Sequence, residues 1–471
     1  MRDRLPTTPP TGPTPPVGPD LPAEPLSHSL KQRHLTMLGL GGVIGAGLFV
    51  GSGAGIGIAG PAIICSYLLA GGLAMLVMRA LGEMSAAMPA SGSFSVYAEK
   101  ALGRWAGFSA GWLYWFLLVV VLAVEATGAA KIANGWLPSV DQWVWVLVFM
   151  VVFTVSNLAA VKNFGEFEFW FAALKVGAIV LFLILGTLAI FGLLPDTDPV
   201  GMANLTGHGG FFPKGLGGVV AGMLAVIFAF GGLEVVTIAA AESDDPAKSV
   251  ARAVRSAVWR ILFFYVGSML VIVTLLPWDS LEPGQSPYVA VLDSIGIPGA
   301  AQIMNIVVFV ALLSALNANL YGSSRMVFSL AERGEAPKAL LKVSGGGVPR
   351  RAVFASVAFG FVSVVLNLLW PDTVFLYMLN AVGAVLLFVW ALIAMSELRL
   401  RRMLERDMPE RLTLRMWCFP YLTWAALLGM AAVLVLMLFD DSARPQLLWS
   451  TGAAAAVLVV AWVRELRAPQ A

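Results

Sequence analysis

The stretch LTMLGLGGVIGAGLFVGSGAGIGIAG, residues 35–60, decides how this chain folds. It contains no Asp, Glu, Lys or Arg, and ten of its last 22 residues are glycine. Its length suits a membrane-crossing helix, which needs about 20 apolar residues, yet each glycine inside a helix destabilises it by about 1 kcal/mol relative to alanine. We therefore expect the helix to break near Gly45-Ala46-Gly47, beside a polar cavity that covers the freed backbone groups. The alternative is that these glycines only let a neighbouring helix approach closely.

Similar apolar segments recur along the whole chain. Of its 471 residues 59% are hydrophobic and only 12% are charged, against about 25% charged in a typical soluble domain. The pattern predicts an all-α polytopic membrane protein with 12 transmembrane helices. The expected spans are residues 36–58, 61–87, 104–134, 142–161, 167–194, 216–241, 256–277, 300–328, 351–370, 373–397, 417–439 and 446–463.

Composition also excludes several classes of protein. The only cysteines, Cys65 and Cys418, both lie in apolar segments, so we expect neither a disulfide framework nor a metal site. A net charge of +2 gives no reason to expect nucleic acid as a partner. The chain has no GxxxxGK[ST] loop and no pairing of a nucleophile with a base, so ATP-driven transport and enzymatic activity are both disfavoured.

The basic residues predict the orientation. If the N-terminal tail is cytoplasmic, the inner segments hold 26 of the 30 Lys and Arg residues and the outer loops hold three. Because positive charge accumulates on the cytoplasmic side of membrane proteins, both termini are expected there, in a plasma-membrane protein surrounded by lipid. The arginine-rich segment 399–415 is interpreted as a solvated surface.

The sixth expected span repeats the feature of the first, because Gly231-Gly232 interrupts it near its centre. Paired glycine-interrupted spans in corresponding positions indicate an inverted-repeat transporter with a midplane site. The expected regions are a disordered Pro-rich cytoplasmic tail (1–30), a transporter core (31–398, with repeats at about 36–194 and 216–397), a basic cytoplasmic loop (399–415), and two accessory transmembrane helices with a C-terminal tail (416–471).

Two broken helices offer a specific binding chemistry. A half-helix that follows Gly47 presents free N–H groups, which suit a carboxylate. A half-helix that ends near Phe228-Ala229-Phe230 presents free carbonyls, which suit an ammonium group. The two ends together predict a site for a zwitterion, and an amino acid is the obvious candidate.

Several long motifs resemble the amino-acid transporter family of the amino acid–polyamine–organocation superfamily. The resemblance covers roughly residues 30–400, and its finer pattern is most similar to bacterial 4-aminobutyrate permeases. The motifs include GLGGVIGAGLFVGSG (39–53), SGSFSVYAEKALG (91–103), EFEFWFAALKV (166–176), FAFGGLE (228–234) and SRMVFSLAERGEAP (324–337). The resemblance implies a leucine-transporter-like 5+5 inverted repeat plus two extra helices. It also implies uptake driven by a proton gradient without any cofactor.

The resemblance also implies site residues. Its motifs place the substrate at Gly45, Ala46, Gly47, Phe228, Ala229, Phe230 and Gly231, with Glu234 directly after them. Glu125 is a further expected substrate-binding residue because of its position inside a span. Ala46 replaces a hydroxyl residue found in relatives, so carboxylate binding would depend on backbone N–H groups. Glu234 has an alternative role as a helix cap, because acidic residues favour the first turn of a helix.

Two charged residues lie inside expected spans, where ionisable groups are functional candidates by default. Glu125 could attract the substrate's ammonium group or could hydrogen-bond a neighbouring helix. Lys175 occupies the place that a sodium ion takes in sodium-coupled relatives, which implies that it carries the coupled proton; the alternative is that it snorkels to the cytoplasmic surface. Ser314, Asn317 and Asn380 are polar candidates of second rank, and they could equally join helices together.

The leading hypothesis is a secondary, proton-coupled importer of 4-aminobutyrate or a related amino acid. The alternative within the class is a permease for an α-amino acid such as proline, alanine, an aromatic or a basic one. An alternative outside the class is a non-transporting amino-acid sensor, which the short tail, with no domain to signal through, disfavours. The sequence predicts no oligomeric state.

Overall fold

The computed structural model describes residues 44–89, 93–159, 164–195, 197–234, 246–281, 284–344, 348–439, 441 and 444–467. All regular secondary structure in these ranges is helical, as expected from the sequence. The predicted disordered tail, 1–30, and the beginning of the first span lie outside the described residues.

Eight helical segments are long and apolar enough to cross a membrane, and three shorter apolar helices accompany them. The eight are Ala46–Ala87, Arg104–Trp136, Glu166–Ile190, Ala300–Glu332, Arg350–Leu369, Val374–Asp407, Tyr421–Phe439 and Leu447–Glu465. The shorter ones are Gln142–Leu158, Gly215–Phe230 and Leu262–Leu275. Each of them overlaps an expected span, and several continue beyond it. The sixth expected span, 216–241, is helical as far as Phe230, and residues 235–245 lie outside the described residues.

The first segment contains two expected spans, because the chain turns at Gly60-Pro61 as the sequence predicts. Helix α3 (Gly51–Ala59) ends there, a 3₁₀ turn (Gly60–Ala62) follows, and α4 (Ile63–Ala87) then begins. Gly60 has a φ of 63°, a conformation that residues with a Cβ rarely adopt. A Cβ there would also lie 2.4 Å from Cγ of Pro213.

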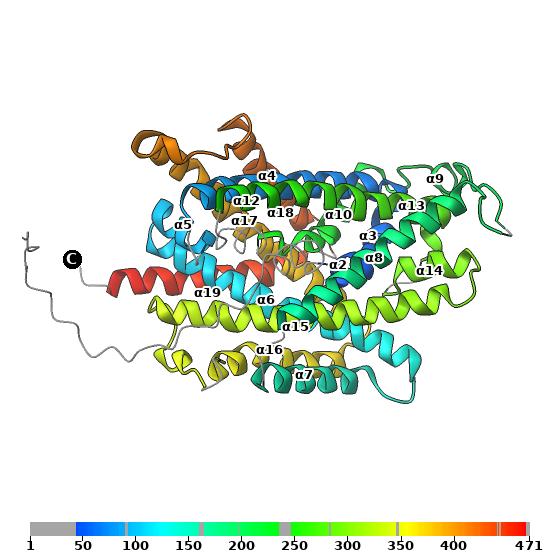
Figure 1. Cartoon of the computed structure of the whole chain (residues 1–471), viewed down its shortest axis with the longest axis horizontal. Helices are drawn as coiled ribbons and strands as arrows, with labels where there is room; N and C mark the ends of the chain where they lie inside the picture. The colour runs from blue at the N-terminus through cyan, green and yellow to red at the C-terminus, as the bar shows by residue number, and fades with distance from the viewer. Residues whose placement is uncertain are drawn as a thin grey trace, which may run out of the picture.

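The long helices run roughly along the longest axis of the molecule and form one bundle (Figure 1). Helices α6 (Arg104–Trp136) and α15 (Ala300–Glu332) pack together along their length at its centre, and α17 (Val374–Asp407) packs on α6. Helix α7 (Gln142–Ala159) lies beside α16 (Arg350–Leu369). Helix α8 (Phe164–Ile190) packs on α13 (Gly267–Leu275) and on α15.

The short helices lie at the two ends of the bundle (Figure 1). Helices α9 (Ala203–Thr206) and α14 (Pro287–Ser294) are at one end, and α5 (Ser93–Leu102) and the last residues of α19 (Arg444–Arg467) are at the other. The basic residues of the segments next to α5 identify that end as the one expected to face the cytoplasm.

Large apolar side chains are exposed on the surface and several ionisable side chains are buried in the interior, which is the reverse of a soluble protein. Trp449 is 81% exposed and Phe439 is 77% exposed, whereas the ionisable residues Glu83, Glu168 and Lys175 are at most 1% exposed. Large apolar side chains on the outside of a helical bundle are stable when lipid covers them. The fold is therefore that of a helical protein embedded in a membrane.

The arginine-rich segment is solvated as predicted at five of its six arginines, and Arg401 is the exception. Helix α17 continues to Asp407, and Arg401 on it is 6% exposed and forms an ion pair of 2.6 Å with Glu83 on α4. Leu412 and Leu414, beyond the helix, are also buried. The segment packs because Leu404, Leu412 and Leu414 recur among the arginines and supply an apolar face, which an interpretation based on charge alone overlooks.

Candidate functional site

The described part of the first glycine-rich segment departs from regular helix at two residues, Gly45 and Val50. Gly45 has φ −145° and ψ −145° and precedes α2 (Ala46–Phe49), and Val50, with φ −121° and ψ −47°, separates α2 from α3. The backbone at the expected break is thus irregular at Gly45, and α2 begins directly after it; we call this place the first interruption. The part of the expected span before Ile44 lies outside the described residues.

The second interruption follows α10 (Gly215–Ile227). A 3₁₀ turn, Phe228–Phe230, ends the helix, Gly231 turns to extended backbone with ψ 142°, and Gly232 has φ 90°. The hydroxyl of Tyr265 donates a hydrogen bond of 2.9 Å to the carbonyl of Ala229. A carbonyl that the helix leaves without a partner is therefore satisfied by a side chain from another helix.

The two interruptions touch each other. A Cβ on Gly47 would lie 2.7 Å from Cα of Ala229 and 2.7 Å from the Phe228 ring. Only a glycine permits this approach, because real Cβ atoms essentially never come that close to backbone. The structure thus brings together two segments that are about 180 residues apart in the sequence, in the way that the expected site requires.

Glu125 lies directly at the first interruption. Both of its carboxylate oxygens accept the backbone N–H of Ala46, at 3.1 and 3.0 Å, and a Cβ on Gly45 would lie 2.3 Å from Oε1. In this conformation Glu125 therefore bonds a neighbouring helix, which is the alternative that the sequence left open. Its carboxylate occupies the place where a substrate carboxylate was expected, because the first N–H groups of a helix have no partner within the helix.

Glu234 serves the second interruption in a similar way. One of its oxygens accepts the N–H of Gly232 at 2.9 Å, and the other accepts the indole N–H of Trp390 on α17. Glu234 is fully buried. These contacts are those of a capping residue, the second of the two roles that the sequence offered for it.

Lys175 on α8 is buried, with 1% of its surface exposed. Its Nζ has no hydrogen-bond partner among the described residues, and the negative charges that act on it are those of Glu168 and Glu125. The side chain does not extend to the surface, so the snorkelling interpretation does not describe this conformation.

Glu168 is a residue that the sequence analysis missed. It is fully buried, and its Oε2 accepts a hydrogen bond of 3.0 Å from Ser314 on α15. A signal was available, because Glu168 and Lys175 are seven residues apart and therefore share one face of α8. The two charged residues lie on one helix, so their common face could be predicted without tertiary information.

The polar candidates of second rank divide into two groups. Ser314 contacts Glu168, and the side-chain oxygen of Asn317 accepts a hydrogen bond of 2.8 Å from Asn157 on α7. These two residues therefore form a polar strip between α8, α15 and α7. Asn380 is half-buried on α17 and does not belong to this strip.

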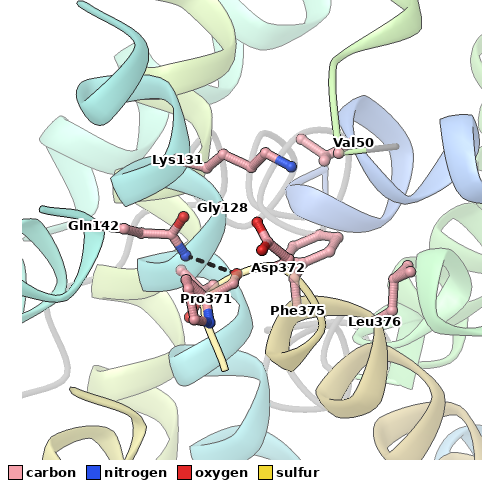
Figure 2. A pocket seen from close by; sticks show the side chains of 10 residues that line it. Val50, Gly128, Lys131, Gln142, Pro371, Asp372, Phe375 and Leu376 are labelled. Carbon is pink, nitrogen blue, oxygen red and sulfur yellow. Dashed lines mark hydrogen bonds between the residues drawn. The ribbon is translucent and has the colours of Figure 1, made fainter. Parts of the chain in front are cut away.

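A small cavity opens beside the first interruption, toward the end of the bundle that carries α14. Figure 2 shows Lys131 and Asp372 entering it from different elements. It is lined by Val50, Thr127, Gly128, Lys131, Gln142, Gly284, Pro371, Asp372, Phe375 and Leu376. Gly128 is one helical turn from Glu125 on α6, so the cavity lies next to the interrupted helices.

Aromatic rings fill the space around the second interruption. Phe230 stacks on Tyr265 with ring centroids 5.1 Å apart and meets the edge of Tyr67 at 6.0 Å. All three rings are buried. The interior beside Phe228–Phe230 is therefore already occupied by protein side chains.

The lipid-exposed bundle and the contact between two interrupted helices define a class, that of helical membrane transporters with a discontinuous-helix site. The chain belongs to the amino acid permease family, whose model matches residues 34–464. It is therefore a multi-pass membrane protein that transports amino acids, and it is not an enzyme.

Individual relatives agree with the family. The gamma-aminobutyric acid permease of Bacillus subtilis is 50% identical over 438 residues, which are 93% of this chain and 93% of that protein. The aromatic amino acid transport protein AroP of Corynebacterium glutamicum is 50% identical over 427 residues, 90% of this chain and 92% of that protein. The gamma-aminobutyric acid permease of Escherichia coli is 46% identical over 91% of both chains.

Among solved structures, a manganese transporter of Eremococcus coleocola superposes with a TM-score of 0.53. The alignment covers 93% of this chain and 94% of the other at 15% identity. This likeness concerns the fold alone.

Proposed function

We propose that this permease imports 4-aminobutyrate, driven by the proton gradient, by alternating access in the plasma membrane. In this proposal 12 transmembrane helices form a 5+5 inverted repeat plus two accessory helices, and both termini are cytoplasmic. No cofactor takes part. The observation that carries the proposal is the contact of the two interrupted helices at Gly47 and Ala229 in a chain of this family.

Two observations support the choice of substrate. Relatives that are 46–50% identical over about nine-tenths of the chain are 4-aminobutyrate permeases. In addition, the rings of Phe230, Tyr67 and Tyr265 occupy the space beside the second interruption. A small linear zwitterion needs only its two charged ends to be bound, whereas an aromatic substrate also needs an apolar pocket for its ring.

The buried Lys175 supports coupling to protons. A cation in a membrane interior is kept only where it has a function, and a lysine exchanges its proton readily when it is desolvated. Protonation and deprotonation of Lys175 near the substrate site would change the charge of that site, and this change would couple substrate transport to the proton gradient. Glu125 and Glu168 supply the opposing charges.

Uptake into proteoliposomes tests the proposal. The purified protein is reconstituted, a pH gradient that is acidic outside is imposed, and accumulation of labelled 4-aminobutyrate is followed with and without sodium. We expect accumulation that requires the pH gradient and is the same with and without sodium. Accumulation that requires sodium, or no uptake of 4-aminobutyrate, would contradict it.

A second candidate substrate is an aromatic amino acid, which the 50% identity to the Corynebacterium glutamicum transporter favours. Competition distinguishes the two. Unlabelled phenylalanine, tyrosine and tryptophan should leave uptake of labelled 4-aminobutyrate unchanged if the first proposal holds. Strong inhibition by all three, together with their own uptake, would favour the second.

A further inference from the structure

We propose that Glu168 accepts the transported proton from Lys175 and releases it toward the cytoplasm. This inference rests on the proposed function, because it specifies the route of the coupled proton. It assigns a role in coupling to a residue that the sequence analysis did not single out.

The first support is the position of both residues on α8. Seven residues separate them, so their Cα atoms are about 10.5 Å apart along the helix axis and on the same face. Both side chains are buried, at 0% and 1% exposure. An extended lysine and a glutamate side chain together can span such a separation.

The second support is that each of these groups has an unused polar atom inside the bundle. Nζ of Lys175 and Oε1 of Glu168 both lack a hydrogen-bond partner among the described residues. Buried polar atoms are normally satisfied, so an unsatisfied cation and an unsatisfied carboxylate oxygen on one helix face indicate a contact that forms in another conformation. In the present conformation no ion pair joins them.

The third support is the placement of Lys175 between two acids. Glu125 lies at the first interruption, bound to Ala46, and Glu168 lies two helical turns along α8 from Lys175. Lys175 therefore has the carboxylate of Glu125 on the side of the substrate site and the carboxylate of Glu168 on the other side. A cation between two carboxylates can turn from one to the other without losing an opposing charge.

The surroundings of Glu168 form a polar path. Ser314 on α15 holds Oε2 at 3.0 Å, Asn317 lies one turn further along α15 beside Glu168, and Asn157 on α7 bonds Asn317 at 2.8 Å. Asn157 is half-buried, so the path leads toward the outside of the bundle. In the orientation that the basic residues predict, α8 begins on the cytoplasmic side, and this is the side to which we assign the release of the proton.

No further charge faces Glu168 from the helices that the structure describes against α8. Helix α13, with the sequence GSMLVIVTL, has no ionisable side chain. On α14, Tyr288 packs on Phe182, which is two turns beyond Lys175 in the opposite direction from Glu168. On α15 the neighbours are the uncharged Ser314 and Asn317. Among the described residues, Lys175 is thus the charged group that acts on Glu168.

The proton step is balanced. An N–H bond of the Lys175 ammonium breaks and an O–H bond forms on Glu168, which leaves a neutral amine and a carboxylic acid. The acid then releases its proton to water on the cytoplasmic side and becomes a carboxylate again. Lys175 takes its next proton from the outside after the transporter reorients.

The test compares Glu168→Gln with the wild type in proteoliposomes. A gradient of one pH unit supports a ~10-fold accumulation when one proton accompanies each substrate, since a tenfold ratio corresponds to ~1.4 kcal/mol. We expect Glu168→Gln to lose this accumulation while it still exchanges labelled for unlabelled substrate. The exchange rate of the variant should no longer depend on the pH of the cytoplasmic side, whereas that of the wild type should. Glu168→Asp should restore part of the accumulation.

Glu166→Gln is the matched control, because it removes a carboxylate of the same helix two residues away. It should accumulate substrate like the wild type. Accumulation by Glu168→Gln equal to that of the wild type would overturn the inference and leave the proposed function intact. A wild type that shows no proton-driven accumulation would instead overturn the proposed function.

A second variant covers the case in which Glu168→Gln does not fold. Ser314→Ala keeps Glu168 and removes the hydrogen bond that holds it. The pH at which uptake is half-maximal should then shift, whereas the protein should still bind substrate. An unchanged midpoint in a folded Ser314→Ala protein would also overturn the inference.

Discussion

Gly47 shows how a single hydrogen in place of a side chain sets the geometry of the site. Its Cα faces the backbone of Ala229 so closely that a methyl group would be 2.7 Å from Cα of Ala229. The other nearby atoms belong to the Phe228 ring, which is itself buried. Neither neighbour can withdraw without shifting the second interruption.

Gly47→Ala should therefore separate the two interrupted helices. Overpacking of this kind destabilises a core by ~1–3 kcal/mol, so we expect uptake to fall roughly tenfold or more, a difference of about 1.4 kcal/mol. Initial uptake rates, normalised to the amount of protein in the membrane, measure the effect. Gly57→Ala is the control, since a Cβ on Gly57 would meet nothing within 4 Å. Equal rates in the two variants would show that the close contact is unimportant.

Lys175 allows a second prediction at the residue scale. Lys175→Met keeps the length of the side chain and removes its charge, and Lys175→Ala removes both. Uphill uptake driven by pH should disappear in both variants, while exchange of labelled for unlabelled substrate should remain measurable, because the interruptions at Gly45 and Gly231 are unaffected. Proteoliposomes loaded with or without substrate separate these activities. Uphill uptake that persists in Lys175→Met would remove the proton role from this residue.

At the scale of elements, α4, α17 and the start of α18 (Tyr421–Phe439) are joined through one carboxylate. Glu83 on α4 pairs with Arg401 on α17 and also accepts the backbone N–H of Met416, just before α18. Thr423 on α18 donates a hydrogen bond of 2.9 Å to Glu397 on α17. These contacts fasten the C-terminal helices to the core near the end expected to be cytoplasmic.

Arg401→Ala should loosen this junction. It leaves the carboxylate of Glu83 buried without its cation, and the loss of one partner of a buried pair destabilises by ~3–5 kcal/mol. We expect a clearly lower midpoint of thermal unfolding in detergent. Arg402→Ala, at an exposed position beside it, should change the free energy of unfolding by less than ~0.5 kcal/mol. The double variant Glu83→Leu/Arg401→Met should recover part of the loss, because it leaves no unpaired charge in the interior. Glu405, which also pairs with Arg401, is half-exposed, and the N–H of Met416 loses its acceptor.

At the scale of the whole molecule, the orientation can be tested with the two cysteines. Cys418 is exposed and precedes α18, at the end of the bundle expected to face the cytoplasm, and Cys65 is partly buried in α4. In a Cys65→Ala background a membrane-impermeant maleimide should label Cys418 in inside-out vesicles and leave it unlabelled in intact cells. Labelling in intact cells, with inside-out vesicles unlabelled, would reverse the proposed orientation.

Some features of the molecule follow from local sequence alone. Apolar runs of about 20 residues specify membrane helices because lipid offers no partner to backbone groups, and this is why the expected spans coincide with helices. The glycines at 45, 47, 231 and 232 likewise indicate interruptions, since each weakens a helix wherever it lies. The charges of Glu125 and Lys175 stand out because ionisable residues are rare in such segments.

Only the tertiary structure decided what these residues touch. The sequence allowed Glu125 two partners, and the packing of α6 against α2 places it on the N–H of Ala46. It treated Arg401 as solvated, and the packing of α17 on α4 buries it against Glu83. It passed over Glu168, whose contact with Ser314 joins residues 146 positions apart. Local composition sets the stability of each helix, but the partner of a buried charge depends on which helices pack together, and that is a property of the folded bundle.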